Sequence, residues 1–355
     1  MKRTARIIIA GLLGLTLVGG ITAYLVVWAP ATTEYIEARS LWIAPGDHMD
    51  AVADSLEARK ILIGSGGFVA LAKFTGWGDQ IKAGHYLIDS GVSNIDILQK
   101  LRKGLQEPVN VYVPAGTRRE RVARSISTNM AFSEADARAA MADSALAMEL
   151  GTDTTNLLGY MLPNTYRFYW LTDAADVIRK VKAEADIVLK QARPADEKRP
   201  LSDQDVLILA SIVEWETNHV PEKATIAGVY LNRIRDRWRL DADPTVQYMV
   251  LMMEGDKRRL YFSDYRQQHP YNTYRFRGLP PGPVTNPSAS SIEAVLNPED
   301  HSYYFFVSTG NGSHLFSSSL AEHNRRAREY RATMDKRRAA QAREAAAAEG
   351  AATEQ

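Results

Sequence analysis

Two glutamates, Glu214 and Glu216, lie two residues apart at the end of an apolar segment and are the first candidates for chemistry. Residues 206–213 read VLILASIV, so a single serine interrupts an otherwise aliphatic run. An ionised carboxylate is unfavourable next to apolar surface, and two interpretations are therefore open. Either both acids lie at a solvated helix end, or one of them is kept protonated and serves as a general acid.

Helical spacing separates the two acids. Ser202 and Asp205 have the S-x-x-D pattern of a helix start, which predicts a helix that carries both glutamates. Residues three, four and seven apart share a face of such a helix. Glu216 then lies beside aliphatic side chains only, namely Leu209, Ile212 and Val213. Glu214 lies beside Leu207, Ala210 and Ser211. Desolvation disfavours the charged form, so we expect Glu216 to have the raised pKa of a general acid.

Metal sites and serine nucleophiles find less support in the sequence. Glu216 and His219 have the E-x-x-H spacing of a di-metal site, but the second E-x-x-H that such a site needs is absent, as is H-E-x-x-H. No G-x-S-x-G occurs either. We expect His85, His314 and His323 to be structural, and the sequence predicts no bound metal.

A long segment rich in Pro, Gly, Asn and Tyr, residues 269–290, interrupts the helical pattern. A loop of this length inside a compact domain is usually functional. Its composition suits a carbohydrate, because aromatic rings stack on the apolar face of a pyranose and amides satisfy hydroxyl and N-acetyl groups. The residues concerned are Tyr271, Asn272, Tyr274, Gly282 and Asn286. Such a wall opposite one buried glutamate predicts cleavage of a glycosidic bond.

The composition narrows the classes of partner. The chain has 355 residues, 45% of them hydrophobic, which suffices for two folded domains. Its 43 basic and 42 acidic side chains leave a formal charge of +1, so nothing favours nucleic acid as a partner. The absence of cysteine excludes disulfides, thiolate zinc sites and a cysteine nucleophile.

An uncharged apolar segment near the N-terminus, residues 7–28, is long enough to cross a membrane. At ~1.5 Å per residue it spans the ~30 Å hydrocarbon core. A cleaved signal peptide is the alternative, since residues 29–31 resemble a cleavage site, but the apolar region of a signal peptide usually has only ~7–15 residues. Basic residues precede the segment, so we expect residues 1–6 to be a cytoplasmic stub and the chain after Trp28 to be extracytoplasmic.

Helices and strands both occur along the rest of the chain, which predicts an α+β fold. Residues 43–62 and 113–127 each combine an apolar residue, a Pro-containing Gly turn and an amphipathic helix, which indicates two related small units. Between them, a strand at residues 85–88 leads into a helix that Ser93 or Asn94 caps. The predicted segments are a tether at 29–39, a small α/β module at 40–115, a larger mixed α+β catalytic domain at 116–333 and a low-complexity tail at 334–355.

Several long motifs occur in a fixed order through the second half of the chain. They are ASIVEWET at 210–217, YLNRI at 230–234, LDADPTVQY at 240–248, PYNTY at 270–274, GLPPGPVTNPS at 278–288 and GSHLFSSSLAEHN at 312–324. Their order and spacing closely resemble the YceG-like family of endolytic murein transglycosylases, most strongly over residues 159–330. The resemblance extends to the N-terminal anchor and to the module at 40–115, which looks like the LysM-like module of the family.

The resemblance implies a single-pass enzyme of the inner membrane with a periplasmic catalytic domain. Such an enzyme would cut MurNAc-GlcNAc bonds inside nascent peptidoglycan strands, leave 1,6-anhydro-MurNAc ends and act as a terminase of glycan elongation. The family's catalytic glutamate falls on Glu216, the acid that helical spacing also selects. Other motif positions expected around the substrate groove are Glu214, Asn232, Asp243, Thr245, Tyr271, Asn272 and Tyr274.

The implied reaction needs no metal or organic cofactor. One carboxyl can serve first as acid and then as base, because the muramoyl 6-hydroxyl of the substrate can itself attack C1. The expected partners are peptidoglycan glycan strands and the inner membrane, with peptidoglycan synthases as further candidates. The alternative interpretation is a non-catalytic peptidoglycan-binding scaffold of the cell-wall synthesis machinery.

Overall fold

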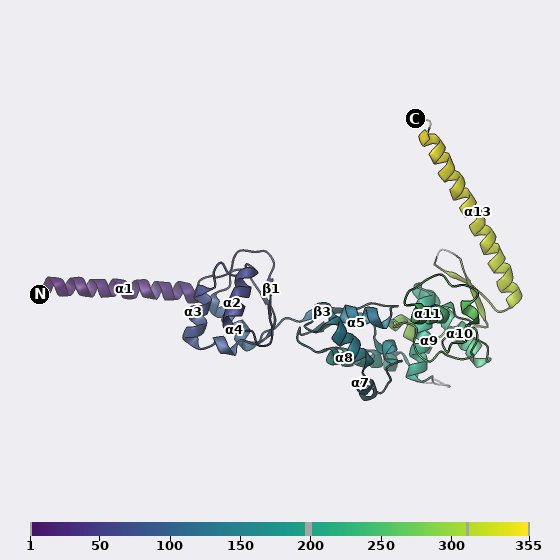
Figure 1. Ribbon diagram of the computed structural model, residues 1–355, viewed down its shortest axis with the longest axis horizontal. Coiled ribbons are helices and arrows are strands. Elements are labelled where there is room, and N and C mark those ends of the chain that lie inside the picture. Colours follow the sequence, from purple (N-terminus) through teal and green to yellow (C-terminus); the bar gives the residue numbers. More distant parts are fainter. Residues whose placement is uncertain (1, 196–200, 310–311, 354–355) are drawn as a thin grey trace. The chain divides into compact units, whose positions relative to one another are not determined.

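The computed structural model describes residues 2–195, 201–309 and 312–353 of the chain (Figure 1). The chain forms two compact units. The first unit consists of the chain up to Val111 together with the short segments 129–131 and 167–172. The second unit comprises the rest, including all of the predicted site residues.

An apolar helix begins the first unit. Within α1 (Lys2–Trp28), the stretch Arg6–Trp28 has a mean hydropathy of 2.0 and is long and apolar enough to span a membrane. Its side chains are exposed up to Leu25, unlike those of an amphipathic helix on a soluble domain, whereas Val26 and Val27 are half-buried and Val27 packs against the core of the first unit. The predicted membrane segment is therefore helical, and residues 2–6 of the predicted stub extend the same helix. Met1 lies outside the described residues.

A two-stranded antiparallel sheet forms part of the core of the first unit. Strand β1 (Arg39–Ile43) pairs with β2 (Gly84–Ile88). The remaining elements are α2 (Met49–Ala58), α3 (Gly66–Thr75), the short turn η1 (Gly78–Gln80) and α4 (Asn94–Lys103). Buried aliphatic and aromatic side chains from the strands and from these helices pack into one hydrophobic cluster.

Two local predictions for the first unit are confirmed. Ser93 caps α4, because its side chain accepts from the backbone of Asp96 while the Asp96 side chain bonds back to Ser93. His85 in β2 is buried, and both ring nitrogens are hydrogen-bonded, to the carbonyl oxygen of Glu107 at 3.0 Å and to Ser40 Oγ at 3.1 Å. His85 is therefore a structural residue.

The rest of the chain is mostly helical. The helices are α5 (Arg119–Ser127), α6 (Glu134–Ala142), α7 (Ser144–Glu149), α8 (Ala174–Ala192), α9 (Asp203–Glu216), α10 (Lys223–Arg235), α11 (Asp243–Glu254), α12 (Ala289–Leu296) and α13 (Leu320–Thr353). Short 3-10 turns are η2 (Leu157–Tyr160), η3 (Val220–Glu222) and η4 (Asp264–Arg266). Strand β3 (Val109–Val113) pairs with β4 (Asn164–Phe168), and β5 (Phe305–Ser308) pairs antiparallel with β6 (His314–Ser317). The mixture agrees with the predicted α+β class.

Helix α9 lies in the core of the second unit, where α10, α11 and α12 all contact it (Figure 1). Every side chain from Val206 through Glu214 is buried. A helix that is apolar on all sides is stable only when neighbours cover all of its faces, which explains the lack of a polar face in this segment. Its last two residues, Trp215 and Glu216, are only half-buried. The end of α9 therefore reaches an opening.

The predicted boundaries around α9 agree with the structure. Ser202 is the N-cap, and its Oγ accepts a hydrogen bond from the Asp205 amide at 3.1 Å. The Pro- and Gly-rich segment has no helix or strand between η4 and the start of α12. Residues 334–353 of the predicted tail continue α13 as helix, while residues 354–355 lie outside the described part of the chain.

Candidate active site

Glu216 is the last residue of α9 and lines an open cavity. The backbone becomes extended at Thr217, which ends the helix at this point. The cavity has a volume of about 480 Å³ and is formed within the second unit. Its walls come from the end of α9, from Asp243 and Gln247 of α11 and from the segment between residues 257 and 265. The carboxyl group therefore borders a space that can admit a substrate.

The surroundings of Glu216 favour a protonated carboxyl. Desolvation by burial raises the pKa of Glu216 to about 7, and the negative charge of Asp243 acts in the same direction. The hydroxyl of Tyr230 in α10 donates a hydrogen bond to Oε1 at 2.5 Å, and this bond and the charge of Arg233 lower the pKa without offsetting the desolvation. A carboxyl with a pKa near neutrality can give and take a proton, as general acid–base catalysis requires. The raised pKa agrees with the prediction from helical spacing.

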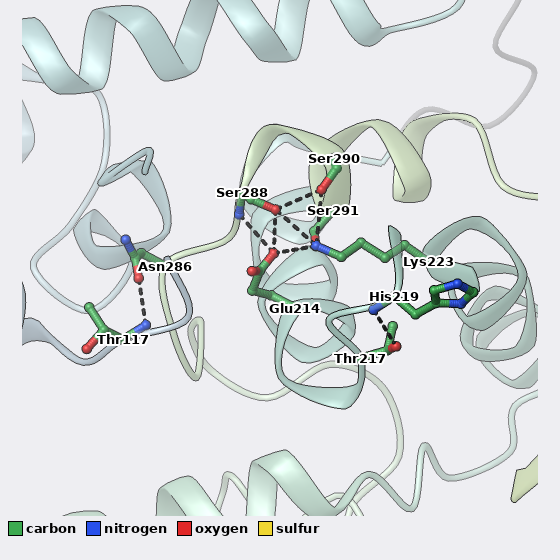
Figure 2. Close-up of polar contacts among 9 residues, drawn as sticks. All are labelled: Thr117, Glu214, Thr217, His219, Lys223, Asn286, Ser288, Ser290 and Ser291. Carbon is green, nitrogen blue, oxygen red and sulfur yellow. Dashed lines mark hydrogen bonds and ion pairs between the residues drawn. The ribbon is translucent and has the colours of Figure 1, made fainter. Parts of the chain in front are cut away.

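Glu214, two residues earlier, has the opposite environment (Figure 2). Its residue is 8% exposed, and Oε2 accepts hydrogen bonds from Lys223 Nζ at 2.9 Å, from Ser288 Oγ at 2.5 Å and from Ser291 Oγ at 2.6 Å. Burial alone would raise the pKa of Glu214, but the hydrogen bonds and the charge of Lys223 outweigh it and lower the pKa. Glu214 is therefore an ionised partner of a buried lysine and connects α9 to α10 and α12.

This buried ion pair also shapes the start of α12. Ser288 occupies the N-cap position of α12, yet its side chain makes no capping hydrogen bond. Its hydroxyl and its backbone amide both donate to Glu214 instead, at 2.5 Å and 3.1 Å (Figure 2). Ser290 completes the cluster by accepting from Lys223 Nζ at 3.1 Å. The end of α9 and the end of the proline-rich loop are thereby held together.

A second carboxylate opens onto the cavity of Glu216. Asp243, the first residue of α11, is exposed, and its Oδ1 accepts a hydrogen bond from the Tyr274 hydroxyl at 2.6 Å. The ring of Tyr274 packs edge-on against Tyr265, with centroids 4.7 Å apart. Burial raises the pKa of Tyr265 to about 12 and raises the pKa of Tyr274 above its ordinary range, so both phenols stay protonated at neutral pH. Asp243 and, through it, Tyr274 therefore lie beside Glu216.

Asn286 fastens the proline-rich loop to two earlier segments of the second unit. Its side chain is fully buried, and its Oδ1 accepts from the Thr117 amide at 2.8 Å (Figure 2). Its Nδ2 donates to the carbonyl oxygens of Pro114 at 2.7 Å and Met161 at 2.8 Å. The loop is therefore held firmly in place, but the amide of Asn286 is used inside the protein rather than offered to a ligand.

Three predicted groove residues have buried side chains that bond to backbone. Asn232 Nδ2 donates to the carbonyl oxygen of His301 at 2.9 Å. The hydroxyl of Thr245 donates to the backbone at the start of α11 at 2.8 Å. Asn272 Nδ2 donates to three carbonyl oxygens within residues 264–267. These three side chains are buried and do not line the cavity of Glu216.

Tyr271 lies at a different cavity of the second unit, with a volume of about 890 Å³. Its ring packs against Tyr248, with centroids 4.9 Å apart. The neighbouring Gly282 has no room for a side chain, because a Cβ there would lie 2.9 Å from the Tyr271 hydroxyl oxygen and 2.7 Å from Thr155 Cγ2. Glycine at this position therefore permits the close approach of the loop to Tyr271.

The histidines near the site contact a structural carboxylate. His219 Nδ1 lies 3.6 Å from Glu222 Oε1, and His314 Nδ1 lies 2.8 Å from Glu222 Oε2. The carboxylate near His219 is therefore Glu222, three residues later in the chain, and the structure gives no sign of the di-metal arrangement that the E-x-x-H spacing of Glu216 and His219 would suggest among the described residues. Within residues 2–195, 201–309 and 312–353, no group of three or more His, Cys, Asp or Glu side chains is placed to hold a metal ion.

Sequence reasoning missed Tyr230 and Lys223, which both lie in α10. Tyr230 contacts Glu216 across a separation of 14 residues, and Lys223 contacts Glu214 across a separation of 9 residues. Both contacts join two helices, so the periodicity of either helix alone does not reveal them. The motif YLNRI, which begins at Tyr230, is the signal that could have pointed to this residue.

Known proteins align with most of the length of this chain. The YceG-like family model matches residues 41–329. A Bacillus subtilis protein named endolytic murein transglycosylase is 28% identical over 304 residues, covering 81% of this chain and 83% of that protein. A Streptococcus pneumoniae protein of the same name is 26% identical, covering 81% of this chain and 57% of its own length. The crystal structure of a YceG-like protein from Listeria monocytogenes aligns with a TM-score of 0.54 and 28% identity over 82% of this chain and 99% of that one. The chain belongs to the YceG-like family.

Proposed function

We propose that the protein is an endolytic lytic transglycosylase of peptidoglycan, with Glu216 as its single catalytic acid and base. The observation that carries this proposal is a carboxyl with a pKa of about 7 on the wall of an open cavity. Membership of the YceG-like family and the names of the relatives support the same chemistry. The proposal includes cleavage of MurNAc-GlcNAc bonds inside nascent strands, 1,6-anhydro-MurNAc ends and a terminase role in glycan elongation.

Glu216 carries out both proton transfers of the proposed reaction. In its protonated form it donates a proton to the glycosidic oxygen as the bond from that oxygen to C1 of the muramoyl residue breaks. As a carboxylate it then accepts the proton of the muramoyl 6-hydroxyl, whose oxygen attacks C1 and closes the 1,6-anhydro ring. The proton that Glu216 gives to the leaving oxygen is replaced by the proton of the 6-hydroxyl, so Glu216 is regenerated and no water is consumed.

Neighbouring groups keep Glu216 close to the balance between its two forms. The hydrogen bond from Tyr230 stabilises the carboxylate, whereas burial and the charge of Asp243 stabilise the acid. Burial also raises the pKa of Tyr230 well above its ordinary value, so its hydroxyl remains a donor. The residues that we propose to contact the glycan are Asp243, Tyr271 and Tyr274. Those that we propose to hold the surrounding walls are Glu214, Asn232, Thr245 and Asn272.

The proposed setting is the inner membrane, with α1 as a single anchor and the catalytic unit on the periplasmic side. Basic residues precede the apolar stretch of α1, as the positive-inside rule requires for this orientation. The proposed organisation is a tether at 29–39, a LysM-like module at 40–115 and a catalytic domain at 116–333. Peptidoglycan strands are the proposed substrate, and peptidoglycan synthases are proposed neighbours.

The test is digestion of purified peptidoglycan sacculi by the full-length protein in detergent, with products read by mass spectrometry. We expect muropeptides with 1,6-anhydro ends from strands that are cut internally, and we expect the same activity when a chelator is present. Products with reducing ends would contradict the attack by the muramoyl hydroxyl. Inhibition by chelator that zinc reverses would indicate a metal mechanism, and binding without any product would favour the non-catalytic scaffold.

A further inference from the structure

A groove continues from the cavity of Glu216 along the second unit. A cavity of about 600 Å³ shares Trp215 and Lys257 with the cavity of Glu216. The cavity of about 890 Å³ that Tyr271 lines shares Arg118 and Arg124 with this second cavity. The shared lining residues place the three spaces next to one another in the second unit, and we take them as neighbouring parts of one binding region.

Positive side chains dominate the middle of this connected space. Arg118, Arg121 and Arg124 of the N-terminal part of the second unit line it together with Lys257, and we call this part the arginine groove. Arg124 is paired with Glu134 at 3.0 Å, so Arg118, Arg121 and Lys257 remain against the two acids of the lining, Glu120 and Asp256. The groove therefore presents an excess of positive charge next to the proposed catalytic carboxyl.

Several of these charges remain available to a ligand. Arg121 is exposed, and its guanidinium has no hydrogen bond or ion pair to another residue in the described part of the chain. The Nε of Arg118 is 3.7 Å from Glu120, and the Arg118 side chain is 43% exposed. The Nζ of Lys257 lies 5.2 Å from the centre of the Trp215 ring and is not held by an acid there. An exposed guanidinium with unused donors is suited to bind a carboxylate through two parallel hydrogen bonds.

The space on the other side of Glu216 has a different character. There the cavity of Glu216 shares Arg259, Leu260 and Tyr265 with a space that is also lined by Arg266 and by the rings of Tyr261, Phe262 and Tyr274. Aromatic rings suit the apolar faces of sugars, whereas arginines suit carboxylates. Both spaces contain basic side chains, and the space with Tyr261, Phe262, Tyr265 and Tyr274 offers more aromatic surface to sugar rings than the arginine groove, whose lining has Trp215 as its aromatic residue.

We propose that the arginine groove binds the carboxylates of the stem peptides attached to the muramoyl residues of the substrate. The stem peptides carry several free carboxylates that lie away from the sugar rings, whereas removal of the peptide by an amidase leaves one carboxylate, on the lactyl group next to the ring. This inference rests on the proposed function, because the peptides belong to the same strand that Glu216 cleaves. The groove would make the enzyme prefer strands that still bear peptides over strands that an amidase has stripped.

The test compares the cleavage of peptide-bearing strands with that of amidase-stripped strands by the full-length protein in detergent. For the unmodified protein we expect a KM roughly tenfold lower on peptide-bearing strands, with a similar kcat. Arg121→Glu is expected to raise the KM on peptide-bearing strands by roughly five- to tenfold and to leave cleavage of stripped strands unchanged. Unchanged cleavage of stripped strands also shows that the variant is folded.

Arg328→Glu is the matched control, because Arg328 is an exposed arginine of α13 that does not line the groove. It makes the same charge change and is expected to leave both KM values unchanged, while Arg121→Lys should retain part of the preference. Equal kcat/KM values on the two substrates would overturn the assignment of the groove, and so would equal effects of Arg121→Glu and Arg328→Glu. Neither outcome would contradict the proposed cleavage reaction. Failure of the unmodified protein to cleave either substrate would instead contradict the proposed function.

Discussion

The surroundings of Glu214 and Glu216 differ although the two carboxylates lie on the same turn of α9. Glu214 is enclosed by donors from α10 and α12 and has a lowered pKa. Glu216 meets one phenol and a like charge, borders a cavity and has a pKa of about 7. The protonation of Glu214 is thus decided by donors from neighbouring helices, whereas that of Glu216 is decided mainly by desolvation. The difference assigns stability to one acid and reactivity to the other.

Replacing Glu216 with Gln tests the reactive half of this comparison and should have the largest effect. Glutamine keeps the size of the side chain but cannot transfer a proton, so we expect kcat to fall by about 10³-fold. The unfolding temperature is expected not to fall. Release of anhydro-ended muropeptides and thermal unfolding measure the two quantities. Full activity of this variant, with a folded but inactive Glu214→Gln, would move the catalytic role to Glu214.

Replacing Glu214 with Gln tests the stabilising half. Lys223 is 4% exposed and would lose its charged partner, so we expect the free energy of unfolding to fall by about 3–5 kcal/mol. Denaturant titration gives this value. The double variant Glu214→Gln with Lys223→Met removes both charges and should recover most of the loss. A single variant as stable as the unmodified protein would show that the ion pair does not hold α9 to its neighbours.

The pH dependence of stability should differ in sign between the two acids. Folding raises the pKa of Glu216 from 4.5 to about 7, so the native state binds more protons and this contribution to stability falls as pH rises through that window. Folding lowers the pKa of Glu214, so its contribution is present above 4.5 and is lost as pH falls below it.

As the pH rises from acidic to mildly alkaline, we therefore expect the free energy of unfolding of Glu216→Gln to increase by about 3 kcal/mol relative to that of the unmodified protein. The loss of free energy of unfolding caused by Glu214→Gln should instead be smallest at acidic pH. Denaturant titrations over a pH series measure both trends. Parallel trends for the two variants would contradict the assigned environments.

The smallest expected effects come from Tyr230 and Asp243, which shift the pKa of Glu216 in opposite directions. Tyr230→Phe removes a hydrogen bond that lowers the pKa of Glu216, so the alkaline limb of the pH–rate profile should move up by about one unit. Asp243→Asn removes a like charge, so the same limb should move down by about half a unit. Shifts in the same direction would show that the two groups do not act through the protonation of Glu216.

Elements that depend on local signals could be predicted from the sequence. The caps Ser93 and Ser202, the apolar helix α1 and the irregular segment before α12 all follow from residues within a few positions of one another. The raised pKa of Glu216 was also predictable in direction, because aliphatic neighbours on the same helix already disfavour its charge.

Contacts between distant segments could not be predicted in the same way. The bond from Ser291 to Glu214 joins residues 77 positions apart, and no periodicity within α9 or α12 indicates it. The amides of Asn272 and Asn286 illustrate a second limit. Their residue types suit a sugar, but both side chains bond to backbone groups instead. Composition shows that a loop is polar and does not show which way an amide faces.

Asn286 also affects the time at which the site can form during synthesis. Its partners Pro114 and Thr117 lie 172 and 169 residues earlier in the chain. A chain made from its N-terminus forms these bonds only after nearly all of the second unit has emerged, and contacts of such long range form slowly. The fastening of the proline-rich loop is therefore among the later steps of folding, because it waits for residue 286 to be made.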